Sequence, residues 1–371
     1  MGSIRTVAHL TSVHPRSDTR IFVKMCLSLA REGFCVSLVV ADGEGDVVNN
    51  GVSIFDVGAK NVNRFYRIWK IVGRVFEKAK VVDADIYHLH DPELIPVGLK
   101  LKKLGKIVIF DAHEDFPNQL LSKAYLSRPI RCILANVFKR YERISCKRFD
   151  AVVAATPFIR DKFLKINKNT IDINNFPVLD EFINYIDWEE KDDEVVYVGS
   201  IAEIRGIKEI VLALDFTEGL RLNLAGIFSD ERFKERVKCY SAWSRVNELG
   251  FLSRSQVTEI MAKSKVGLVI LHPTINYIDA LPVKMFEYMA AGIPCIASDF
   301  PIWREILESN QCGICVDPLD PEAIGQAIQY LIDQPAKSEQ MGKNGRQAVE
   351  QKYNWSVEEQ KLFKLYESFV V

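Results

Sequence analysis

Residues 280–299 read ALPVKMFEYMAAGIPCIASD and contain the boundary signals of one helix–strand unit. Proline at the start of a helix and glycine just after its end are typical, so a helix is predicted to begin at Pro282 or Val283 and stop at Gly292. The apolar run Pro294–Ser298 then has the length of one buried strand. A helix followed by a buried strand is the repeating unit of a parallel α/β sheet.

The same alternation extends along the chain on both sides of this unit. Strands are predicted at Arg5–Leu10, Cys35–Val40, Ile86–Leu89, Ile107–Asp111, Ala151–Ala155, Glu194–Val198, Leu220–Ala225, Arg245–Leu249, Val266–Leu271 and Gly313–Val316. Helices are predicted at Ile21–Glu32, Phe65–Ala79, Leu94–Leu104, Lys208–Leu214, Glu231–Tyr240, Ser255–Lys263, Ile302–Leu307 and Pro321–Asp333. The pattern predicts an α/β protein with two parallel sheets.

The length of 371 residues suits two domains that each bury a core. Residues 171–188, IDINNFPVLDEFINYIDW, combine strand, turn and break signals. We therefore place a linker at 176–190, between an N-terminal domain at 1–175 and a C-terminal domain at 191–355. Residues 356–371 form an amphipathic helix, which we expect to pack on the N-terminal domain.

Composition indicates a cytoplasmic protein. The sequence has no apolar run near the roughly 20 residues that a membrane span requires. The N-terminus is typical of a first strand rather than a signal peptide. Of eight cysteines, only Cys312 and Cys315 have ligand-like spacing, and a second ligand pair is missing. We expect free thiols in a reducing compartment and no metal site.

Charge is distributed unevenly. Residues 1–178 hold 28 Lys/Arg against 18 Asp/Glu, and the remainder holds 20 against 31. Such asymmetry indicates a charged partner for one half. The basic excess is densest at 122–149, where apolar residues also recur at three- and four-residue spacing, as in an amphipathic helix. Its apolar face could contact an anionic membrane surface at the inner membrane face, or it could pack on its own domain.

The helix predicted after Pro282 has the features of an anion site. Free N–H groups at its start, with Lys284 beside them, attract negative charge. Glu287 lies one turn further along and could accept hydrogen bonds from sugar hydroxyls. Phosphate and hydroxyl groups together are the chemistry of a sugar nucleotide.

Residues 280–299 resemble family 4 of the retaining GT-B glycosyltransferases (glycosyl transferases group 1), which carry a carboxylate pair spaced E-x7-E. Glu287 matches the second glutamate, which binds ribose in that family, and Asp279 stands eight positions earlier in place of the first. The resemblance implies two Rossmann-like domains that face each other across a cleft. It also implies a nucleoside-diphosphate sugar as donor substrate, UDP- or GDP-linked, and no separate cofactor.

Residues 198–207, VGSIAEIRGI, resemble the glycine turn of the same family. Gly199 and Ser200 form the turn, and Ser200 replaces an arginine that relatives usually carry. Arg205 stands where they have lysine and is the main predicted diphosphate contact, because its planar guanidinium suits phosphate oxygens. Three other cations could compensate for the missing arginine: Lys284, Arg16 and Arg20.

Two further segments complete the predicted donor site. Gly250, Phe251 and Leu252 follow a strand and resemble the loop that contacts the nucleobase. Leu281 and Val283 flank the start of the predicted helix, and we place them at the donor as well.

The N-terminal half carries three matching motifs. Residues 111–117, DAHEDFP, resemble a strand-end histidine loop, in which His113 would contact the donor sugar near the reacting carbon. Residues 14–21, HPRSDTRI, and 90–94, HDPEL, resemble one subgroup of the family. Arg20 could face the cleft, or it could pair with Asp18.

The resemblance implies sugar transfer with retention at the anomeric carbon. His113, Asp279 and Glu287 are the predicted catalytic residues, with positive groups stabilising the leaving diphosphate. A saccharide or polyprenyl-diphosphate-linked acceptor in cell-surface polysaccharide synthesis would suit the basic N-terminal half, and no nucleic-acid partner is expected. Two alternatives are a sugar-nucleotide epimerase and a non-catalytic nucleotide-sugar-binding subunit. A dehydrogenase is disfavoured because no G-x-G-x-x-G motif follows the first strand.

Overall fold

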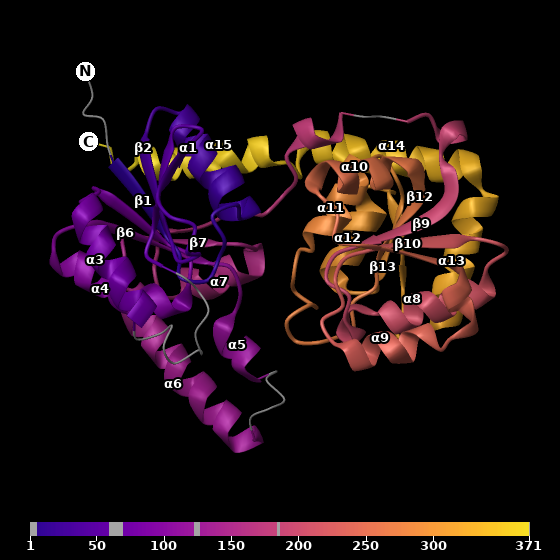
Figure 1. Ribbon diagram of the computed structural model, residues 1–371, viewed down its shortest axis with the longest axis horizontal. Coiled ribbons are helices and arrows are strands. Elements are labelled where there is room, and N and C mark those ends of the chain that lie inside the picture. The colour runs from indigo at the N-terminus through magenta and orange to yellow at the C-terminus, as the bar shows by residue number, and fades with distance from the viewer. Residues whose placement is uncertain (1–5, 59–69, 122–126, 184–185, 371) are drawn as a thin grey trace. The chain divides into compact units, whose positions relative to one another are not determined.

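The computed structural model describes residues 6–58, 70–121, 127–183 and 186–370 (Figure 1). The chain divides into a first domain, Met1–Asn175 with Ser356–Val371, and a second domain, Phe176–Trp355. Parts of five predicted segments lie outside the described residues: Arg5 of the first strand, 65–69 of the second helix, 122–126 of the basic segment, 184–185 of the linker and Val371 of the C-terminal helix.

Within the described residues, the first domain is built on one sheet with the strand order β3-β4-β2-β1-β5-β6-β7-β8. Its strands are β1 (Thr6–Leu10), β2 (Cys35–Val40), β3 (Val47–Asn49), β4 (Val52–Asp56), β5 (Ile86–Leu89), β6 (Ile107–Ala112), β7 (Ala151–Ala154) and β8 (Thr170–Asp172). Only the β3–β4 pair is antiparallel. The central strands are buried and largely apolar, as parallel strands covered on both faces should be.

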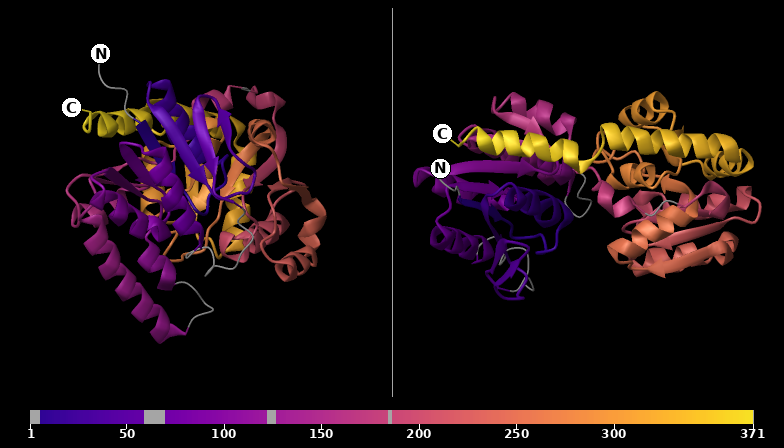
Figure 2. Two further views of the ribbon diagram at one scale, coloured as in Figure 1. Left: turned by 60° about the vertical axis from the view of Figure 1, so that its left-hand side comes forward. Right: turned by 90° about the horizontal axis from the view of Figure 1, so that it is seen from above.

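Helices cover both faces of this sheet. A π-helix at Thr19–Cys26 continues into α1 (Leu27–Arg31), followed by α3 (Val72–Val82), α4 (Ile95–Lys103), α5 (Phe116–Leu121), α6 (Arg128–Cys146) and α7 (Pro157–Leu164). Asp18 caps the π-helix by accepting hydrogen bonds from the Arg20 and Ile21 amides. In Figures 1 and 2, α6 extends well beyond the sheet.

The last helix, α15 (Trp355–Glu367), belongs to the first domain from Ser356 onward. Figure 1 shows it, in yellow, beside α1. Glu359 accepts a 2.8 Å hydrogen bond from Ser28, and Glu358 accepts one of 2.8 Å from the Asn174 amide. The C-terminal residues are thus part of the first domain's core.

The second domain has a parallel sheet with the order β11-β10-β9-β12-β13-β14 among its described residues. Its strands are β9 (Asp192–Val198), β10 (Arg221–Ala225), β11 (Val246–Gly250), β12 (Ser264–Val269), β13 (Cys295–Ser298) and β14 (Gly313–Val316). Its helices are α8 (Ile207–Ala213), α9 (Glu231–Lys238), α10 (Arg254–Lys263), α11 (Val283–Ala290), α12 (Pro301–Ser309), α13 (Pro321–Asp333) and α14 (Pro335–Gln351). Two apolar cores lie on the two faces of the sheet.

The structure differs from the prediction in several places. Helix α14 was not predicted, because it carries glycines that usually disfavour helices; a Cβ on Gly342 would lie 2.1 Å from the Gly292 carbonyl oxygen, so glycine permits close packing there. The predicted linker 176–190 also belongs to the second domain, and it buries three large side chains there: Phe176, Phe182 and Trp188 are about 5% exposed. That segment packs into the second domain rather than spanning between domains.

Candidate active site

Three glycines lie together where β9, β10 and β11 end in the second domain. The Gly199 amide donates to the Ala225 carbonyl at 2.9 Å, and the Gly226 amide donates to the Gly250 carbonyl at 2.8 Å. A Cβ on Gly226, which has φ of 148°, would lie 1.8 Å from the Gly199 carbonyl oxygen. Glycine is therefore required for these turns to approach each other at the ligand-binding edge of the sheet.

Lys284, in the first turn of α11, points its ammonium group at the Gly199 turn. Its Nζ would lie 3.0 Å from a Cβ placed on Gly199, and it sits 3.7 Å above the ring of Tyr197. The side chain is buried, and among the described residues its Nζ has no hydrogen-bond partner. Burial, together with the positive charge of Arg205, holds the pKa of Lys284 well below its usual range.

Arg205 lies beside the same tyrosine, at the end of a short 3-10 helix (Glu203–Arg205). The Tyr197 hydroxyl donates to the Ser200 carbonyl at 2.9 Å and also interacts with Arg205. Burial raises the pKa of Tyr197 to about 12, against the opposing effect of Arg205. Arg205 and Lys284 thus place two positive groups around one glycine turn.

Glu287, one turn after Lys284, is held by an ion pair with Arg254. Its Oε1 lies 2.7 Å from Arg254, whose guanidinium also contacts Glu181 at 2.6 Å. Glu287 is 7% exposed, and it lies close enough to Lys284 to raise that amine's pKa slightly. Arg254 thus fixes the Glu287 carboxylate close to Lys284.

The other predicted donor residues surround this group less closely. Asp279 and Leu281 are half-buried in the segment before α11, which is fixed by a 2.7 Å hydrogen bond from the Trp303 indole to the Ala280 carbonyl. Val283 begins α11, and Ser200 is exposed beside Gly199. Phe251 is 80% exposed, so its ring forms no wall of a base pocket within the second domain.

In the first domain, Asp111 organises the polar residues at the end of β6. It accepts two hydrogen bonds from Arg20, at 3.0 and 2.7 Å, and one of 2.7 Å from His113 Nε2. Burial favours the neutral acid, but Arg20 and His113 outweigh it and hold the pKa of Asp111 well below its usual range. Because the ionised carboxylate only accepts, His113 donates from Nε2, which leaves Nδ1 for another partner.

Arg20 itself differs from its predicted role. Its third nitrogen donates to the Ile173 carbonyl at 2.8 Å, and the side chain is 5% exposed. Every guanidinium nitrogen therefore has a partner inside the first domain, and Asp18 pairs with His14 instead. Arg16 is likewise occupied by Asp42, with two contacts of 2.7 Å. Both arginines are thus already paired with carboxylates of the first domain.

A chain of buried rings extends from Asp111 to α15. His90 Nδ1 donates to Asp111 at 3.1 Å, and its Nε2 lies 2.8 Å from His9 Nδ1. Tyr366 then contacts His9 at 3.4 Å and His88 at 2.8 Å. Burial lowers the pKa of all three of these histidines and so favours their neutral form.

Two groups in this region have the spacing of metal ligands. They are His9, His88 and His90, and His90, Asp111 and His113, with ligand atoms within 4.8 Å of one another in each group. The hydrogen bonds just described account for that spacing. All eight cysteines are free thiols.

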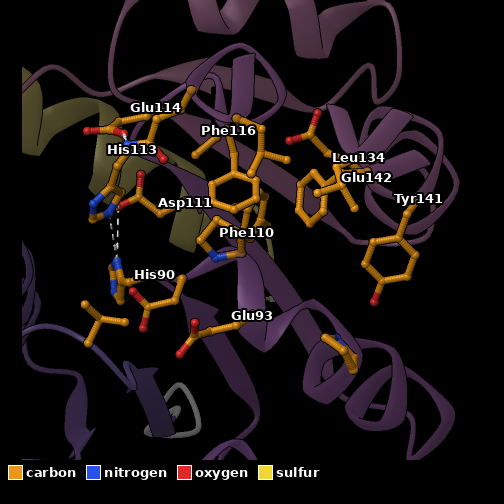
Figure 3. Close-up of a pocket in the computed structure, with 18 of the residues that line it drawn as sticks. His90, Glu93, Phe110, Asp111, His113, Glu114, Phe116, Leu134, Tyr141 and Glu142 are labelled. Atoms are coloured by element: carbon orange, nitrogen blue, oxygen red, sulfur yellow. Dashed lines mark hydrogen bonds and ion pairs between the residues drawn. The ribbon is translucent and has the colours of Figure 1, made fainter. Parts of the chain in front are cut away.

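A cavity of about 730 Å³ opens beside His113 in the first domain (Figure 3). Figure 3 shows His90, Asp111 and His113 at one end and Leu134 and Tyr141 at the other, with Phe116 between them. Sequence analysis did not identify this pocket, because its walls come from three strand ends and three helices that meet only in the fold.

Four residues of the site were also missed: Tyr197, Gly226, Asp111 and Arg254. Gly226 carries the signal that identified Gly199, a glycine directly after a predicted strand. Asp111 lies inside the quoted histidine loop. No sequence signal identifies Arg254, because its pairing with Glu287 depends on the fold.

Comparisons with known proteins match both halves of the chain. A family model described as Glycosyltransferase Family 4 matches residues 19–173, and one described as Glycosyl transferases group 1 matches residues 180–348. An uncharacterised glycosyltransferase of Methanocaldococcus jannaschii is 23% identical over 341 residues, which covers 82% of each chain.

Solved structures show the same fold. Sucrose-phosphate synthase from Thermosynechococcus elongatus has a TM-score of 0.79 at 19% identity, over 98% of this chain and 99% of that one. HepE of Anabaena, solved in complex with UDP-glucose, has a TM-score of 0.74 at 13% identity, over 98% and 100%.

The fold and the site define a glycosyltransferase of the GT-B type. The chain belongs to the group 1 glycosyltransferases and is an enzyme of that family, as the sequence motifs predict. Among the described residues, no helix is both long enough and apolar enough to cross a membrane.

Proposed function

We propose that this enzyme transfers a sugar from a UDP- or GDP-linked donor to a saccharide or lipid-linked saccharide, with retention at the anomeric carbon. The observation that carries the donor assignment is the buried Lys284 ammonium group, which has no partner among the described residues and points at the Gly199 turn. A buried cation is costly unless an anion accompanies it. A diphosphate on the glycine turn would supply that anion. HepE, which has this fold, was solved with UDP-glucose.

The same residues suit the chemistry of transfer. Negative charge grows on the diphosphate as its bond to the sugar breaks, and fixed positive groups stabilise that charge. Arg205, Lys284 and the amides at the start of α11 are those groups. Glu287 would bind the ribose, and Asp279 the donor sugar. His113, oriented by Asp111, would contact the sugar near the reacting carbon.

The acceptor would be assembled at a membrane surface, as in cell-surface polysaccharide synthesis. On α6 the apolar residues Ile130, Ile133, Leu134, Val137 and Ile144 are 43–63% exposed. Exposed basic residues accompany them, including Arg128, Lys139, Arg140, Arg143 and Lys147. Of the two interpretations of this segment, an outward surface for anionic lipid fits these exposures better than packing on its own domain.

A panel of UDP- and GDP-sugars, scored by thermal shift and then by turnover, tests the donor. A true donor should raise the melting temperature, because it binds only the native state. Release of nucleoside diphosphate that depends on acceptor would support transfer. Formation of an epimer without acceptor would favour an epimerase, and binding without consumption under any acceptor would favour a non-catalytic subunit.

Liposome flotation tests the membrane surface. Arg140→Glu on α6 combined with Lys147→Glu directly after it should abolish recovery with anionic vesicles, while Arg232→Glu on α9, also an exposed arginine, should not. Equal recovery of wild-type protein with neutral and anionic vesicles would contradict the proposal.

A further inference from the structure

The cavity beside His113 has two chemically different ends. Its polar end presents His14, His90, Asp91, Glu93, His113 and Glu114. Its other end is almost wholly apolar, with Phe110, Phe116, Leu120, Leu134, Val137, Phe138 and Tyr141. A ligand that fills it must therefore be polar at one end and apolar at the other.

The apolar end is lined by aromatic rings that pack against one another. Phe116 and Phe138 have ring centroids 4.6 Å apart, and Phe138 and Tyr141 are 5.9 Å apart. Glu142, the acid at this end, is buried and lies 2.7 Å from Lys162. Sugar hydroxyls would find few hydrogen-bond partners here and would lose those of water. A hydrocarbon chain would instead lower its free energy by moving from water to this apolar surface.

The apolar end is continuous with the exposed stripe of α6. Leu134 and Val137 line the cavity, yet they are 43% and 63% exposed. Ile130 and Ile133 extend the same stripe outside the cavity. One apolar path therefore leads from the outer surface of α6 to the residues around His113.

The polar end is acidic, which limits the group that can lie beside His113. Asp91 accepts hydrogen bonds from Thr11 and from the Ser12 amide, and Glu93 accepts one from Ser12. Carboxylates so close together repel phosphate but accept hydrogen bonds from hydroxyls.

We propose that the cavity is an acceptor subsite for a lipid, whose chain lies along Phe116, Phe138 and Leu134 and whose neutral, hydroxyl-bearing head lies at His113. The inference rests on the proposed transferase function and specifies its acceptor class. The lipid reaches the cavity along the α6 stripe. A head group with phosphate directly beside His113 is disfavoured by Asp91 and Glu93.

Binding of dodecyl maltoside below its micelle concentration tests the inference on the full-length protein. Maltose supplies the same head without a chain, and dodecyl phosphate supplies a similar chain with an anionic head. We expect dodecyl maltoside to bind at least about tenfold more tightly than either. Maltose lacks the methylenes that add to affinity when buried, and the head of dodecyl phosphate is repelled by Asp91 and Glu93. Equal binding of maltose and dodecyl maltoside would overturn the chain subsite, and tighter binding of dodecyl phosphate would overturn the neutral head.

Variants on one helix separate the cavity from the outer surface. Leu134→Gln should weaken dodecyl maltoside binding severalfold, because Leu134 lines the cavity. Ile133→Gln, its exposed neighbour outside the cavity, should leave binding unchanged; equal weakening by both would mean that the ligand only coats α6. Both side chains are partly exposed, so both variants should fold. UDP binding is measured on the same samples. If the protein binds UDP but not dodecyl maltoside, the lipid subsite is refuted while the proposed transferase function stands.

Discussion

Replacing Lys284 with methionine should stabilise the free enzyme and weaken its donor binding at the same time. Methionine has nearly the length of lysine and would keep the contact with the Tyr197 ring. It lacks the amine, which is buried without a hydrogen-bond partner among the described residues. The amine is therefore a cost to folding that only a bound anion offsets.

The expected magnitudes follow from that burial. An unsatisfied buried polar group costs about 1–3 kcal/mol, so Lys284→Met should raise the free energy of unfolding by a similar amount. For a domain of the size of Phe176–Trp355, each kcal/mol corresponds to roughly 2–4 °C in melting temperature. A hydrogen bond to a charged group contributes about 1.5–3 kcal/mol, so UDP affinity should fall about 10- to 150-fold.

Calorimetry adds a second signature of the same amine. Burial and Arg205 lower the pKa of Lys284, so its amine gives up a proton more readily in the free enzyme than an ordinary lysine does. A diphosphate beside it favours the charged form, and binding should therefore take up protons. Titrations of UDP in phosphate and in Tris buffer, which differ in ionisation enthalpy, measure that uptake. Lys284→Met should lose it.

A second buried lysine provides the control. Lys191 is 5% exposed, and burial lowers its pKa to about 8, but it donates to the Ala262 carbonyl. Lys191→Met loses that bond, so it should not be stabilised, and UDP binding should be unchanged. The reasoning is refuted if Lys284→Met is less stable than wild type and binds UDP as tightly.

Two further predictions concern backbone and charge. Gly226→Ala should lower the free energy of unfolding by about 1–3 kcal/mol in urea titrations and weaken UDP binding, because the new Cβ would displace the Gly199 carbonyl. Gly219→Ala, with φ of 66° and open space around it, should leave UDP binding intact. Asp18→Asn should destabilise the enzyme by about 2 kcal/mol at pH 5, since His14 and backbone amides outweigh burial and lower the pKa of Asp18 from 3.8 to about 2. Asp18 and Asp91 raise the pKa of His14 above 6.5 despite its burial, so the imidazole loses its positive charge as pH rises through that pKa. The part of the destabilisation that comes from the Asp18–His14 ion pair should shrink over the same range. A destabilisation that stays constant from pH 5 to 9 would contradict the ion pair.

The strand–helix alternation was predictable because buried parallel strands are short apolar runs. The predicted strands Cys35–Val40, Ile86–Leu89 and Gly313–Val316 match the structure residue for residue. The hairpin of β3 and β4 was not predicted, since β3 is exposed on all three residues and shows no alternation. The pattern of apolar residues reveals only strands that are buried, and no residue of β3 is buried.

Site residues were predictable where a motif sits at a strand end. Gly199, Lys284 and Glu287 follow from the order of glycine turn, helix start and acid, and the structure brings them together. Their partners were not predictable. Arg254 reaches Glu287 from another helix, and such long-range pairs depend on the packing of elements rather than on spacing.

The contrast between Arg20 and Lys284 shows what the structure adds. Both are basic residues within or near the quoted motifs, and the sequence analysis named both as possible contacts of the donor diphosphate. Arg20 is buried, and every nitrogen of its guanidinium group has a partner. Its charge stabilises the Asp111 carboxylate, and it also donates a hydrogen bond to the Ile173 carbonyl. Lys284 is equally buried, but its ammonium group has no such partner among the described residues. A charge that folding has already neutralised stabilises the protein, whereas one left without a counter-charge favours an anionic ligand. Of these two residues, Lys284 is therefore the candidate for holding the diphosphate, beside Arg205.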